Sequence, residues 1–384
     1  MGESFDIIIV GAGIVGAACA AACARGGLRV LVVDRGPVGG GTTAAGMGHL
    51  VVLDDSQAQF ALTYYSRSLW HQLAGLLPAD VEYNQCGTLW VASDEEEMAE
   101  VRRKEKLYAA AGVHAEVLDG LELEELEPNL RPGVAGGRPG VAGGLRVPED
   151  AVLYPPSAAR FLLEQAQQQG AQVRTGVSVR SLLGEGGVVL ADGSRVSAGR
   201  TVSATGPWAP ELTPGLPVRK RKGHLVITER YPGFVNHQIV ELGYLKSAHG
   251  AGKDSVAFNI QPRKNGQMLI GSSRQYEAED TAVDQPILDR MLNRALEYLP
   301  SLGQLSAIRV WTGHRAATPD KLPLIGPSQE SDRIWLATGH EGLGITTSLG
   351  TAGLLADLLL DRATAIPAAP YSPARFAKTS SVND

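Results

Sequence analysis

A glycine-rich turn between a buried strand and a helix constrains the fold of this chain more than any other feature of its sequence. Residues 5–10 (FDIIIV) form a β-branched run without polar alternation, which predicts a parallel strand buried on both faces. The turn at residues 11–16 (GAGIVG) leads into an alanine-rich helix, and residues 28–34 (LRVLVVD) predict the next strand. This complete order of strand, turn, helix and strand predicts the βαβ unit that binds dinucleotides.

The residue types around this turn suit a bound pyrophosphate and ribose. Gly11 permits the tight turn, Gly13 lets the pyrophosphate approach the backbone, and Gly16 lets the helix pack closely on the strand. The helix N-terminus supplies N–H groups for the phosphates. Asp34 ends the second strand, where a carboxylate accepts hydrogen bonds from ribose hydroxyls and disfavours a 2′-phosphate. These features alone do not separate NAD from FAD as the dinucleotide.

Elements of a dinucleotide-binding fold recur in the middle and near the end of the 384 residues. Residues 200–206 predict one strand, and residues 334–337 predict another, followed by a glycine turn and a helix over 346–360. Alternating strands over 223–273 predict an antiparallel sheet. We therefore expect an α/β fold with a discontinuous Rossmann-like domain (residues 1–50, 151–215 and 311–370), an α+β domain with a large antiparallel sheet (51–150 and 216–310) and a tail (371–384).

Composition and charge exclude several classes of function. The net charge is −6, from 35 basic and 41 acidic residues, which gives no basic field for nucleic acid. We interpret the basic run at residues 219–222 (RKRK) as a solvated strand end. No apolar stretch reaches the roughly 18 residues of a membrane span, and we expect no signal peptide. A cytoplasmic location is expected, with peripheral attachment to the inner face of the membrane as an alternative.

The cysteines and an internal duplication predict structure rather than chemistry. Cys19 and Cys23 lie four residues apart in the alanine-rich helix, so they share a face and fill space there. With Cys86 they make up the three cysteines of the chain, which fits a reducing compartment and predicts no metal site. Residues 131–137 and 138–144 repeat the heptad RPGVAGG, whose proline and glycine content predicts a loop.

Several segments spread along nearly the whole chain resemble one family in the order in which they occur. They are the N-terminal turn, the loop at 39–46 (GGGTTAAG), residues 202–208 (VSATGPW), and the C-terminal segments 313–315 (GHR), 322–326 (LPLIG) and 338–346 (TGHEGLGIT). Their sequences are similar to those of the D-amino acid oxidase superfamily, which includes glycine oxidase, sarcosine oxidase and D-amino acid dehydrogenase. The resemblance implies FAD as the cofactor and a glutathione-reductase-type FAD-binding domain. Within the superfamily, the chain most resembles the flavin subunits of D-hydroxyproline dehydrogenase and hydrogen cyanide synthase.

The resemblance also implies which residues contact FAD. The loop at 42–46 would follow the pyrophosphate and the flavin edge, Val179 would contact adenine, and the turn at 342–346 would present a helix N-terminus to the flavin N1–C2=O locus. Such a terminus stabilises the negative charge of reduced flavin. No cysteine follows Cys86 to form a thioether in the carboxyl half, so FAD should be non-covalent, with a link through a histidine as the alternative. The expected contact residues are Gly11, Gly13, Ile14, Val15, Gly16, Asp34, Arg35, Thr42, Thr43, Ala44, Ala45, Gly46, Met47, Val179, Ala204, Thr205, Gly206, Trp208, Gly313, Gly339, Gly342, Leu343, Gly344, Ile345 and Thr346.

Arg315 is the expected substrate residue. In the family, an arginine in this Gly-x-Arg segment binds the substrate carboxylate, and a guanidinium matches a carboxylate with two parallel hydrogen bonds. The alternative is a structural ion pair, for which Asp320 is the candidate acid. Glycine oxidase carries a second arginine in the turn where this chain has Glu341, Gly342 and Leu343, so another residue is expected to assist.

Three further side chains are candidates for that assisting role. His224 lies in a segment that approaches the flavin in the family, Tyr244 follows it in the predicted sheet, and His49 follows the glycine-rich loop. For each histidine by itself, a packed or surface position is the alternative interpretation.

The resemblance implies an oxidoreductase acting on the C–N bond of a small amino or imino acid. Hydride would pass from the substrate α-carbon to flavin N5, and the protein would contribute positioning rather than an obligate general base. D-Proline or cis-4-hydroxy-D-proline is the first expected substrate, and glycine or sarcosine, with oxygen as acceptor, is the second. Smaller electron-transfer subunits are expected partners. The rival classes are a non-catalytic FAD-binding subunit of a larger complex and an NAD-dependent enzyme on a similar fold.

Overall fold

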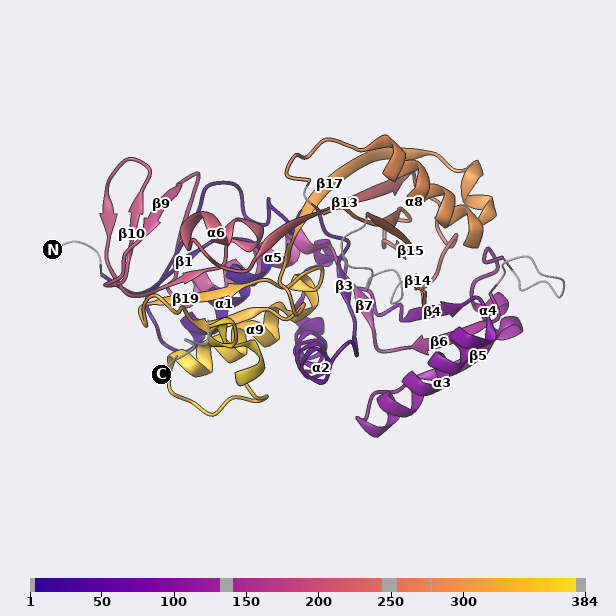
Figure 1. Ribbon diagram of the computed structural model, residues 1–384, viewed down its shortest axis with the longest axis horizontal. Helices are drawn as coiled ribbons and strands as arrows, with labels where there is room; N and C mark the ends of the chain where they lie inside the picture. The colour runs from indigo at the N-terminus through magenta and orange to yellow at the C-terminus, as the bar shows by residue number, and fades with distance from the viewer. Residues whose placement is uncertain (1–3, 132–140, 244–253, 277, 378–384) are drawn as a thin grey trace, which may run out of the picture.

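Two sheets organise the chain in the computed structural model, which describes residues 4–131, 141–243, 254–276 and 278–377. One sheet has six strands in the order β18-β19-β12-β1-β2-β8, and the other has eight in the order β17-β13-β16-β15-β14-β4-β6-β5. The six-stranded sheet lies in the left half of Figure 1 and most of the eight-stranded sheet in the right half. This arrangement confirms the predicted α/β fold with a Rossmann-like sheet beside a second, larger sheet.

The six-stranded sheet joins segments that are far apart in the sequence. β1 pairs in parallel with β2 and β12, and β12 pairs in parallel with β19, while β18 is antiparallel at the edge. Its two faces are buried against different layers, because Ile7 and Ile9 of β1 pack against helices and Ile8 and Val10 pack against a small three-stranded sheet. The strands are β1 (Phe5–Val10), β2 (Val30–Asp34), β8 (Gln172–Thr175), β12 (Ala198–Ser203), β18 (Leu324–Pro327) and β19 (Ile334–Thr338), and the small sheet is β9 (Val179–Leu182), β10 (Val188–Leu190) and β11 (Arg195–Val196).

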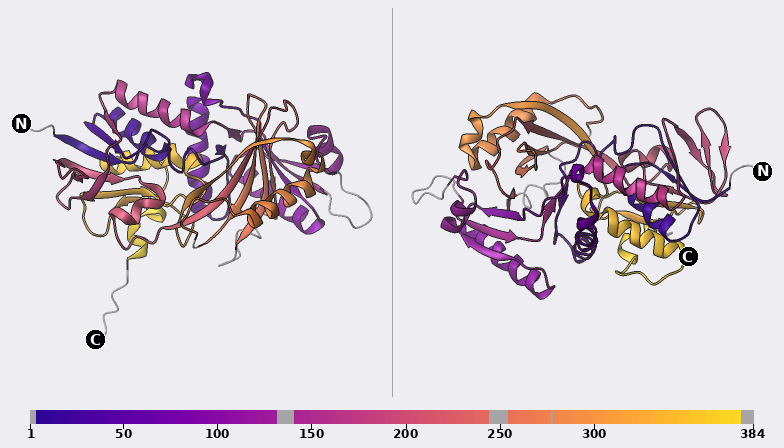
Figure 2. Two further views of the ribbon diagram at one scale, coloured as in Figure 1. Left: turned by 90° about the horizontal axis from the view of Figure 1, so that it is seen from above. Right: turned by 180° about the vertical axis from the view of Figure 1, so that it is seen from behind.

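The eight-stranded sheet is mixed rather than purely antiparallel. The expected antiparallel pairs form between β13, β15 and β16, but β14 pairs in parallel with β4, which belongs to a distant part of the chain. Helix α8 packs on β15 and β16, as the views in Figure 2 show. The strands are β4 (Thr88–Ala92), β5 (Glu116–Asp119), β6 (Gly143–Val147), β13 (Arg219–Thr228), β14 (Gln238–Glu241), β15 (Ser255–Pro262), β16 (Met268–Arg274) and β17 (Ala307–Ala317).

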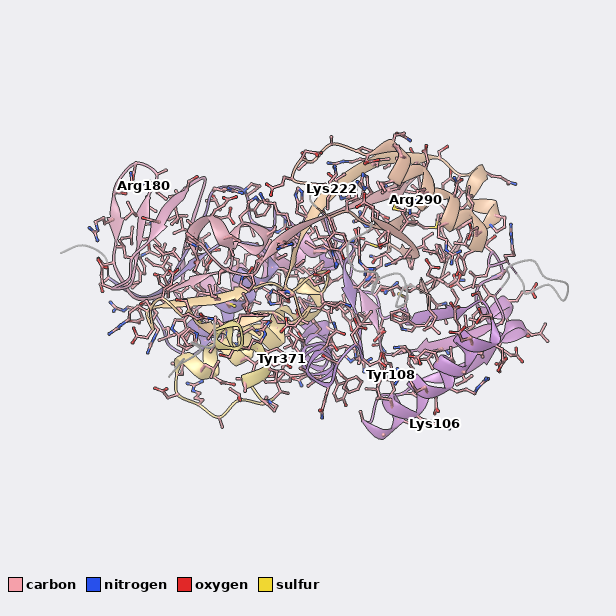
Figure 3. The ribbon with its side chains drawn as sticks, viewed as in Figure 1. Lys106, Tyr108, Arg180, Lys222, Arg290 and Tyr371 are labelled. Atoms are coloured by element: carbon pink, nitrogen blue, oxygen red, sulfur yellow. The ribbon has the colours of Figure 1, made fainter. Side chains whose placement is uncertain are left out.

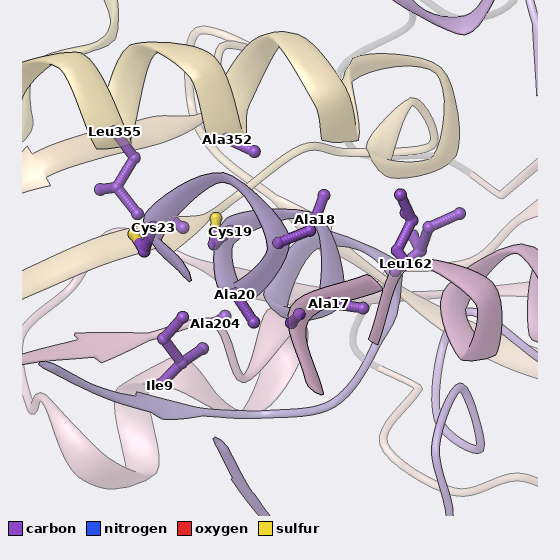
Figure 4. Packing of buried hydrophobic residues seen from close by; sticks show 14 of the residues in the cluster. Ile9, Ala17, Ala18, Cys19, Ala20, Cys23, Leu162, Ala204, Ala352 and Leu355 are labelled. Carbon is purple, nitrogen blue, oxygen red and sulfur yellow. The ribbon is translucent and has the colours of Figure 1, made fainter. Parts of the chain in front are cut away.

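The alanine-rich helix α1 lies at the centre of the largest hydrophobic core. In Figure 4 it lies between α5 and α9, with Ala17 and Ala18 on its flanks and the strand β1 beneath it. Cys19 and Cys23 are fully buried there, which confirms their space-filling role, and burial raises the pKa of the Cys23 thiol to about 12. The described helices are α1 (Ile14–Arg25), α2 (Gln57–Leu73), α3 (Glu95–Ala110), α4 (Gly120–Leu126), α5 (Pro155–Gln168), α6 (Ala209–Leu212), α8 (Gln285–Tyr298) and α9 (Gly344–Leu359), and a two-stranded sheet joins β3 (His49–Leu50) to β7 (Ala151–Val152).

The long strands β13 and β17 extend from one sheet region toward the other. They pair along nearly their whole length, and Figure 1 shows them crossing the top of the molecule together. The expected domain boundary at residue 311 therefore falls inside β17. This continuous pair brings its ends at residues 219–223 and 313–317 to the segment after β12 and to the turn before α9.

Two expectations from the sequence are wrong because distant segments cover the residues concerned. The run at 219–222 is a solvated strand end only at its start: Arg219 is exposed, but Arg221 and Lys222 are buried, and Lys222, labelled in Figure 3, forms an ion pair with Asp280. The expected tail is folded as far as residue 377, in the short 3₁₀ helices Ala369–Tyr371 and Pro373–Phe376. Tyr371 is fully buried and donates a hydrogen bond from its hydroxyl to the Ala58 carbonyl at 2.6 Å. Most of the duplicated heptad segment, residues 132–140, lies outside the described residues.

The close approach of α1 to the glycine turn generates a stability prediction. A Cβ at Gly16 would lie 1.9 Å from the carbonyl oxygen of Gly11, which is a backbone atom and not the end of a flexible side chain. Gly16→Ala should therefore lower the thermal unfolding midpoint strongly or prevent folding. Gly184→Ala is the matched control, because a Cβ at this exposed turn meets no atom within 4 Å. Equal midpoints for the two variants would contradict the tight contact.

Candidate functional site

A cavity of about 530 Å³ lies between the two sheets and is the candidate site. One end is formed by the glycine turn after β1 and by the loop after β12, and the other by the inner face of the eight-stranded sheet. The structure brings together at its wall most of the residues expected to contact FAD: Gly11, Gly13, Ile14, Val15, Asp34, Arg35, Thr42, Thr43, Ala45, Gly46, Met47, Val179, Ala204, Thr205, Gly206, Trp208, Gly313, Gly342, Leu343, Gly344 and Ile345.

A few expected contact residues do not line the cavity. Gly16 is packed against the turn, and Ala44 and Gly339 are not part of the lining. Thr346 is buried, and its hydroxyl donates to the His49 carbonyl at 2.7 Å. Thr346 therefore joins the last helix to the segment after the glycine-rich loop.

The end of the cavity near α1 has the features of a dinucleotide cradle. Gly11 has φ +112°, and a Cβ there would lie 2.5 Å from the Ala204 carbonyl, so the turn needs glycine. Asp34 accepts backbone hydrogen bonds from Ala12 at 2.6 Å and from Gly36 at 2.7 Å, one on each carboxylate oxygen. Because each oxygen accepts a single bond in this way, each keeps capacity for a ribose hydroxyl.

The other end of the cradle combines a helix N-terminus with two close backbone contacts. Helix α9 begins at Gly344, and its N-cap Leu343 supplies no side-chain hydrogen bond, so the first-turn N–H groups keep their partial positive charge for a ligand. A Cβ at Gly313 would lie 2.4 Å from Cβ of Ala45, and one at Gly46 would lie 2.8 Å from Cδ1 of Ile345. The described residues thus fit an extended dinucleotide between α1 and α9.

Arg315 is held on the cavity wall between two glycines. A Cβ at Gly223 would lie 2.4 Å from Nη1 of Arg315, and one at Gly342 would lie 3.4 Å from its Nε. Its Nη1 donates a hydrogen bond to the Ser273 carbonyl at 2.9 Å. Asp320, the candidate acid for a structural ion pair, instead binds Arg375 through two hydrogen bonds.

A second arginine, which sequence reasoning missed, lies directly opposite Arg315. Arg221 on β13 pairs with Arg315 in the strand register, lines the cavity, and forms a buried ion pair with Glu341. The Glu341 carboxylate therefore compensates the charge of Arg221 inside the cavity wall. The basic run at 219–222 contained a signal for this position. Successive residues of a strand point to opposite faces, so two of the four basic side chains must face the other side of the sheet.

The three candidates for an assisting role have different surroundings. His49 lines the cavity, and burial, together with the positive charge of Arg315, lowers its pKa to about 4. His224 is fully buried behind the wall, where its Nδ1 lies 2.9 Å from the Ser273 hydroxyl and its Nε2 accepts from the Asp284 backbone N–H. His224 therefore supports the residue whose carbonyl holds Arg315. Tyr244 lies outside the described residues.

The inner face of the eight-stranded sheet adds polar residues that no pattern in the sequence indicated. Arg274 on β16, Asn259 on β15, Gln238 on β14 and Trp90 on β4 all line the cavity. They come from strands separated by up to about half of the chain, so local patterns could not bring them together.

In the described ranges, none of the helices is long and apolar enough to cross a membrane.

The buried histidines predict how stability depends on pH. Burial lowers the pKa of His340 to about 3, whereas an imidazole in the unfolded chain takes up a proton near pH 6.5. Below pH 6.5 the unfolded state therefore binds more protons, and stability present above that pH is lost as the pH falls toward 3. At pH 5 the loss from His340 is on the order of 2 kcal/mol.

His340→Gln tests this dependence, because the glutamine amide can reach Thr351, whose hydroxyl lies 3.0 Å from Nε2 of His340. The unfolding midpoint of the natural protein should fall more between pH 7 and pH 5 than that of the variant. Differential scanning calorimetry at both pH values measures this difference. Parallel decreases in the two proteins would show that His340 is not a source of acid sensitivity.

Comparisons with known proteins identify the family of this chain. Residues 6–358 match the family model described as DAO, FAD dependent oxidoreductase. The hydrogen cyanide synthase subunit HcnC of Pseudomonas aeruginosa is 29% identical over 98% of this chain and 97% of its own length. Glycine oxidase of the same organism is 28% identical over 96% of this chain and 98% of its own length.

Solved structures with the same fold superpose on nearly the whole chain. The crystal structure of glycine oxidase from Geobacillus kaustophilus superposes with a TM-score of 0.85 at 26% identity, over 97% of this chain and 99% of that one. The L-proline dehydrogenase from P. horikoshii superposes with a TM-score of 0.86 at 24% identity, over 98% of each chain, and this shows the shared fold. With its family match extending from β1 to α9 and a cradle that fits the dinucleotide, this chain belongs to the DAO family of FAD-dependent oxidoreductases.

Proposed function

We propose that this protein oxidises the C–N bond of a small amino or imino acid whose carboxylate binds to Arg315. The observation that carries the proposal is the position of this guanidinium on the cavity wall, flanked by Gly223 and by Gly342 of the turn that begins α9. The fork of N–H groups matches the two oxygens of a carboxylate. A bound acid would therefore lie next to the α9 end of the FAD cradle.

The residues around Arg315 support a role in orientation. Ser273 accepts a hydrogen bond from Nη1, and His224 contacts the Ser273 hydroxyl, so the guanidinium is held by a chain of contacts. His49 is neutral at pH 7 because its pKa is about 4, so it adds no second positive charge beside the substrate. FAD, when bound, supplies the acceptor for the hydride that leaves the α-carbon. The contribution of the protein is to hold that carbon in a reactive position.

Within this class, D-proline or cis-4-hydroxy-D-proline is our first proposed substrate, and glycine or sarcosine with oxygen as acceptor is the second. The similarity to a subunit of hydrogen cyanide synthase favours a protein that works within a complex. For the first candidate we propose smaller electron-transfer subunits as the partners in that complex. The similarity to glycine oxidase favours the second candidate. The two differ in electron acceptor, so oxygen consumption measured beside dye reduction separates them.

A non-catalytic FAD-binding subunit is the alternative from another class. It would keep the yellow cofactor but would not be reduced by any amino acid. Anaerobic titration of the purified protein with D-, L- and N-methyl amino acids distinguishes the two. Loss of the flavin absorption on adding one of them is the expected result.

Arg315→Lys should be far from conservative, because a point ammonium cannot reproduce the planar fork. We expect the rate of flavin reduction to fall on the order of 10²-fold, since a misplaced α-carbon is misaligned for transfer. Arg309→Lys is the matched control, because Arg309 is an exposed residue of the same strand outside the cavity. FAD content and the unfolding midpoint should stay unchanged in both. Normal reduction of Arg315→Lys by a carboxylate substrate would refute the role of Arg315.

Gly223→Ala should displace Arg315 without removing it. The new Cβ meets the end of a flexible side chain, so the guanidinium should move and the backbone should stay in place. The substrate concentration for half-maximal flavin reduction should rise roughly tenfold or more, the cost of about one charged hydrogen bond. Gly184→Ala serves again as the control, and an unchanged half-saturating concentration in Gly223→Ala would argue against this placement.

A further inference from the structure

Three polar side chains surround Val240 on the inner face of the eight-stranded sheet. Trp90 on β4 and Asn259 on β15 are the direct cross-strand partners of Val240 on β14. Gln238 precedes Val240 by two residues, so it points to the same face of the strand. All four residues line the cavity, and we call Trp90, Gln238 and Asn259 the polar wall.

The polar wall is deeply buried and its hydrogen bonds are incomplete. Trp90, Gln238 and Asn259 are 3%, 1% and 6% exposed. Among the described residues, no partner is found for Nε1 of Trp90, Oε1 of Gln238 or Oδ1 of Asn259. Burying such groups without partners costs about 1–3 kcal/mol each, and folded proteins rarely leave them so. Three neighbouring examples on one cavity wall point to a ligand that completes them.

His49 adds a fourth polar group to the same cavity. Its Nε2 is also buried and has no hydrogen-bond partner among the described residues. A hydrogen bond with the Gln261 side chain raises the pKa of His49, but burial lowers this pKa by more, so the ring stays neutral. Gln261 follows Asn259 by two residues on the same face of β15. Because a neutral imidazole nitrogen either donates or accepts, His49 can complement a ligand group of either kind.

We propose that the polar wall is the subsite for the substrate side chain and that this side chain carries a neutral group that both donates and accepts hydrogen bonds, a hydroxyl or a carboxamide. This inference rests on the proposed amino or imino acid oxidation. The indole N–H of Trp90 only donates, whereas Gln238 and Asn259 each offer a carbonyl oxygen and an NH₂, which exchange places when the amide turns over. A hydroxyl or carboxamide satisfies both kinds of partner. An apolar side chain would leave all of them unsatisfied.

The neutral character of the wall argues against a charged side chain at this position. A second carboxylate would need a positive partner in contact with it, and none of the three wall residues carries charge. Arg274, which lines the same cavity from β16, already has an interaction partner of its own. Arg315 is assigned to the α-carboxylate in the proposed function. Between two substrates of similar size, the polar wall would therefore favour the one whose side chain carries a hydroxyl or an amide.

The test uses the FAD-loaded enzyme and pairs of amino acids that differ in one polar group. The pairs are alanine with serine and proline with 4-hydroxyproline, each as both enantiomers, and aspartate is included as the charged probe. Anaerobic flavin reduction gives the second-order rate constant for each compound. The natural enzyme should prefer the hydroxylated member of a pair by roughly tenfold or more, the effect of about one hydrogen bond.

Asn259→Leu and Gln238→Met keep side-chain size and remove the hydrogen-bonding groups. Each should reduce the preference for the hydroxylated member severalfold, and Asn259→Leu should keep or raise the unfolding midpoint, because an unsatisfied buried group is removed. Val240→Ala is the matched control: it enlarges the same wall but keeps its polar groups, so it should change both members of a pair by a similar factor. A natural enzyme that prefers the plain member, or variants that keep the original preference, would overturn the subsite.

Three further outcomes also decide the proposal. Faster reduction by aspartate than by serine would replace the neutral subsite with a carboxylate-binding one. If no amino acid bleaches the flavin, the proposed function itself fails. If plain and hydroxylated compounds bleach it equally, the proposed function stands and the polar wall is not a side-chain subsite.

Discussion

The close contact between helix α1 and the glycine turn is the constraint on which the rest of the structure depends. The turn leaves β1 at Gly11, and Gly16 then lies directly against the Gly11 carbonyl. Asp34 at the end of β2 holds the same turn through the backbone of Ala12. The position of the dinucleotide cradle therefore follows from contacts within the first thirty-four residues of the chain, and other segments are added around it.

The two sheets cooperate through the paired strands β13 and β17. Their length lets one hydrogen-bonded ladder belong to the eight-stranded sheet and still reach the edge of the FAD cradle. Arg315 lies near the end of this ladder, where Gly223 leaves room for its guanidinium. A rigid pair of strands positions a substrate group more reproducibly than a loop, and this precision is what hydride transfer needs.

The cavity also contains several buried polar and charged groups that lower the stability of the fold. The ion pair of Arg221 with Glu341 is buried there, and burial keeps His49 and His340 neutral by lowering their pKa. Several buried amide groups also lack hydrogen-bond partners among the described residues. Each of these features costs stability, and a helix-and-sheet core without them would be more stable. Their concentration at one cavity is typical of a site selected for binding rather than for folding.

Local patterns of glycines, β-branched residues and alternation were enough to predict the βαβ unit, the α/β class, and the strand and helix over residues 334–360. The expectation that Arg315 binds the substrate came from the family resemblance of its segment and not from a local pattern. The sequence by itself did not determine that Arg221 is buried, that His224 lies behind the wall while His49 lines it, or that Trp90, Gln238 and Asn259 share one face. Those features depend on which strands become neighbours in the eight-stranded sheet. Pairing such as that of β14 with β4 joins segments roughly 150 residues apart, and only the tertiary structure decides it.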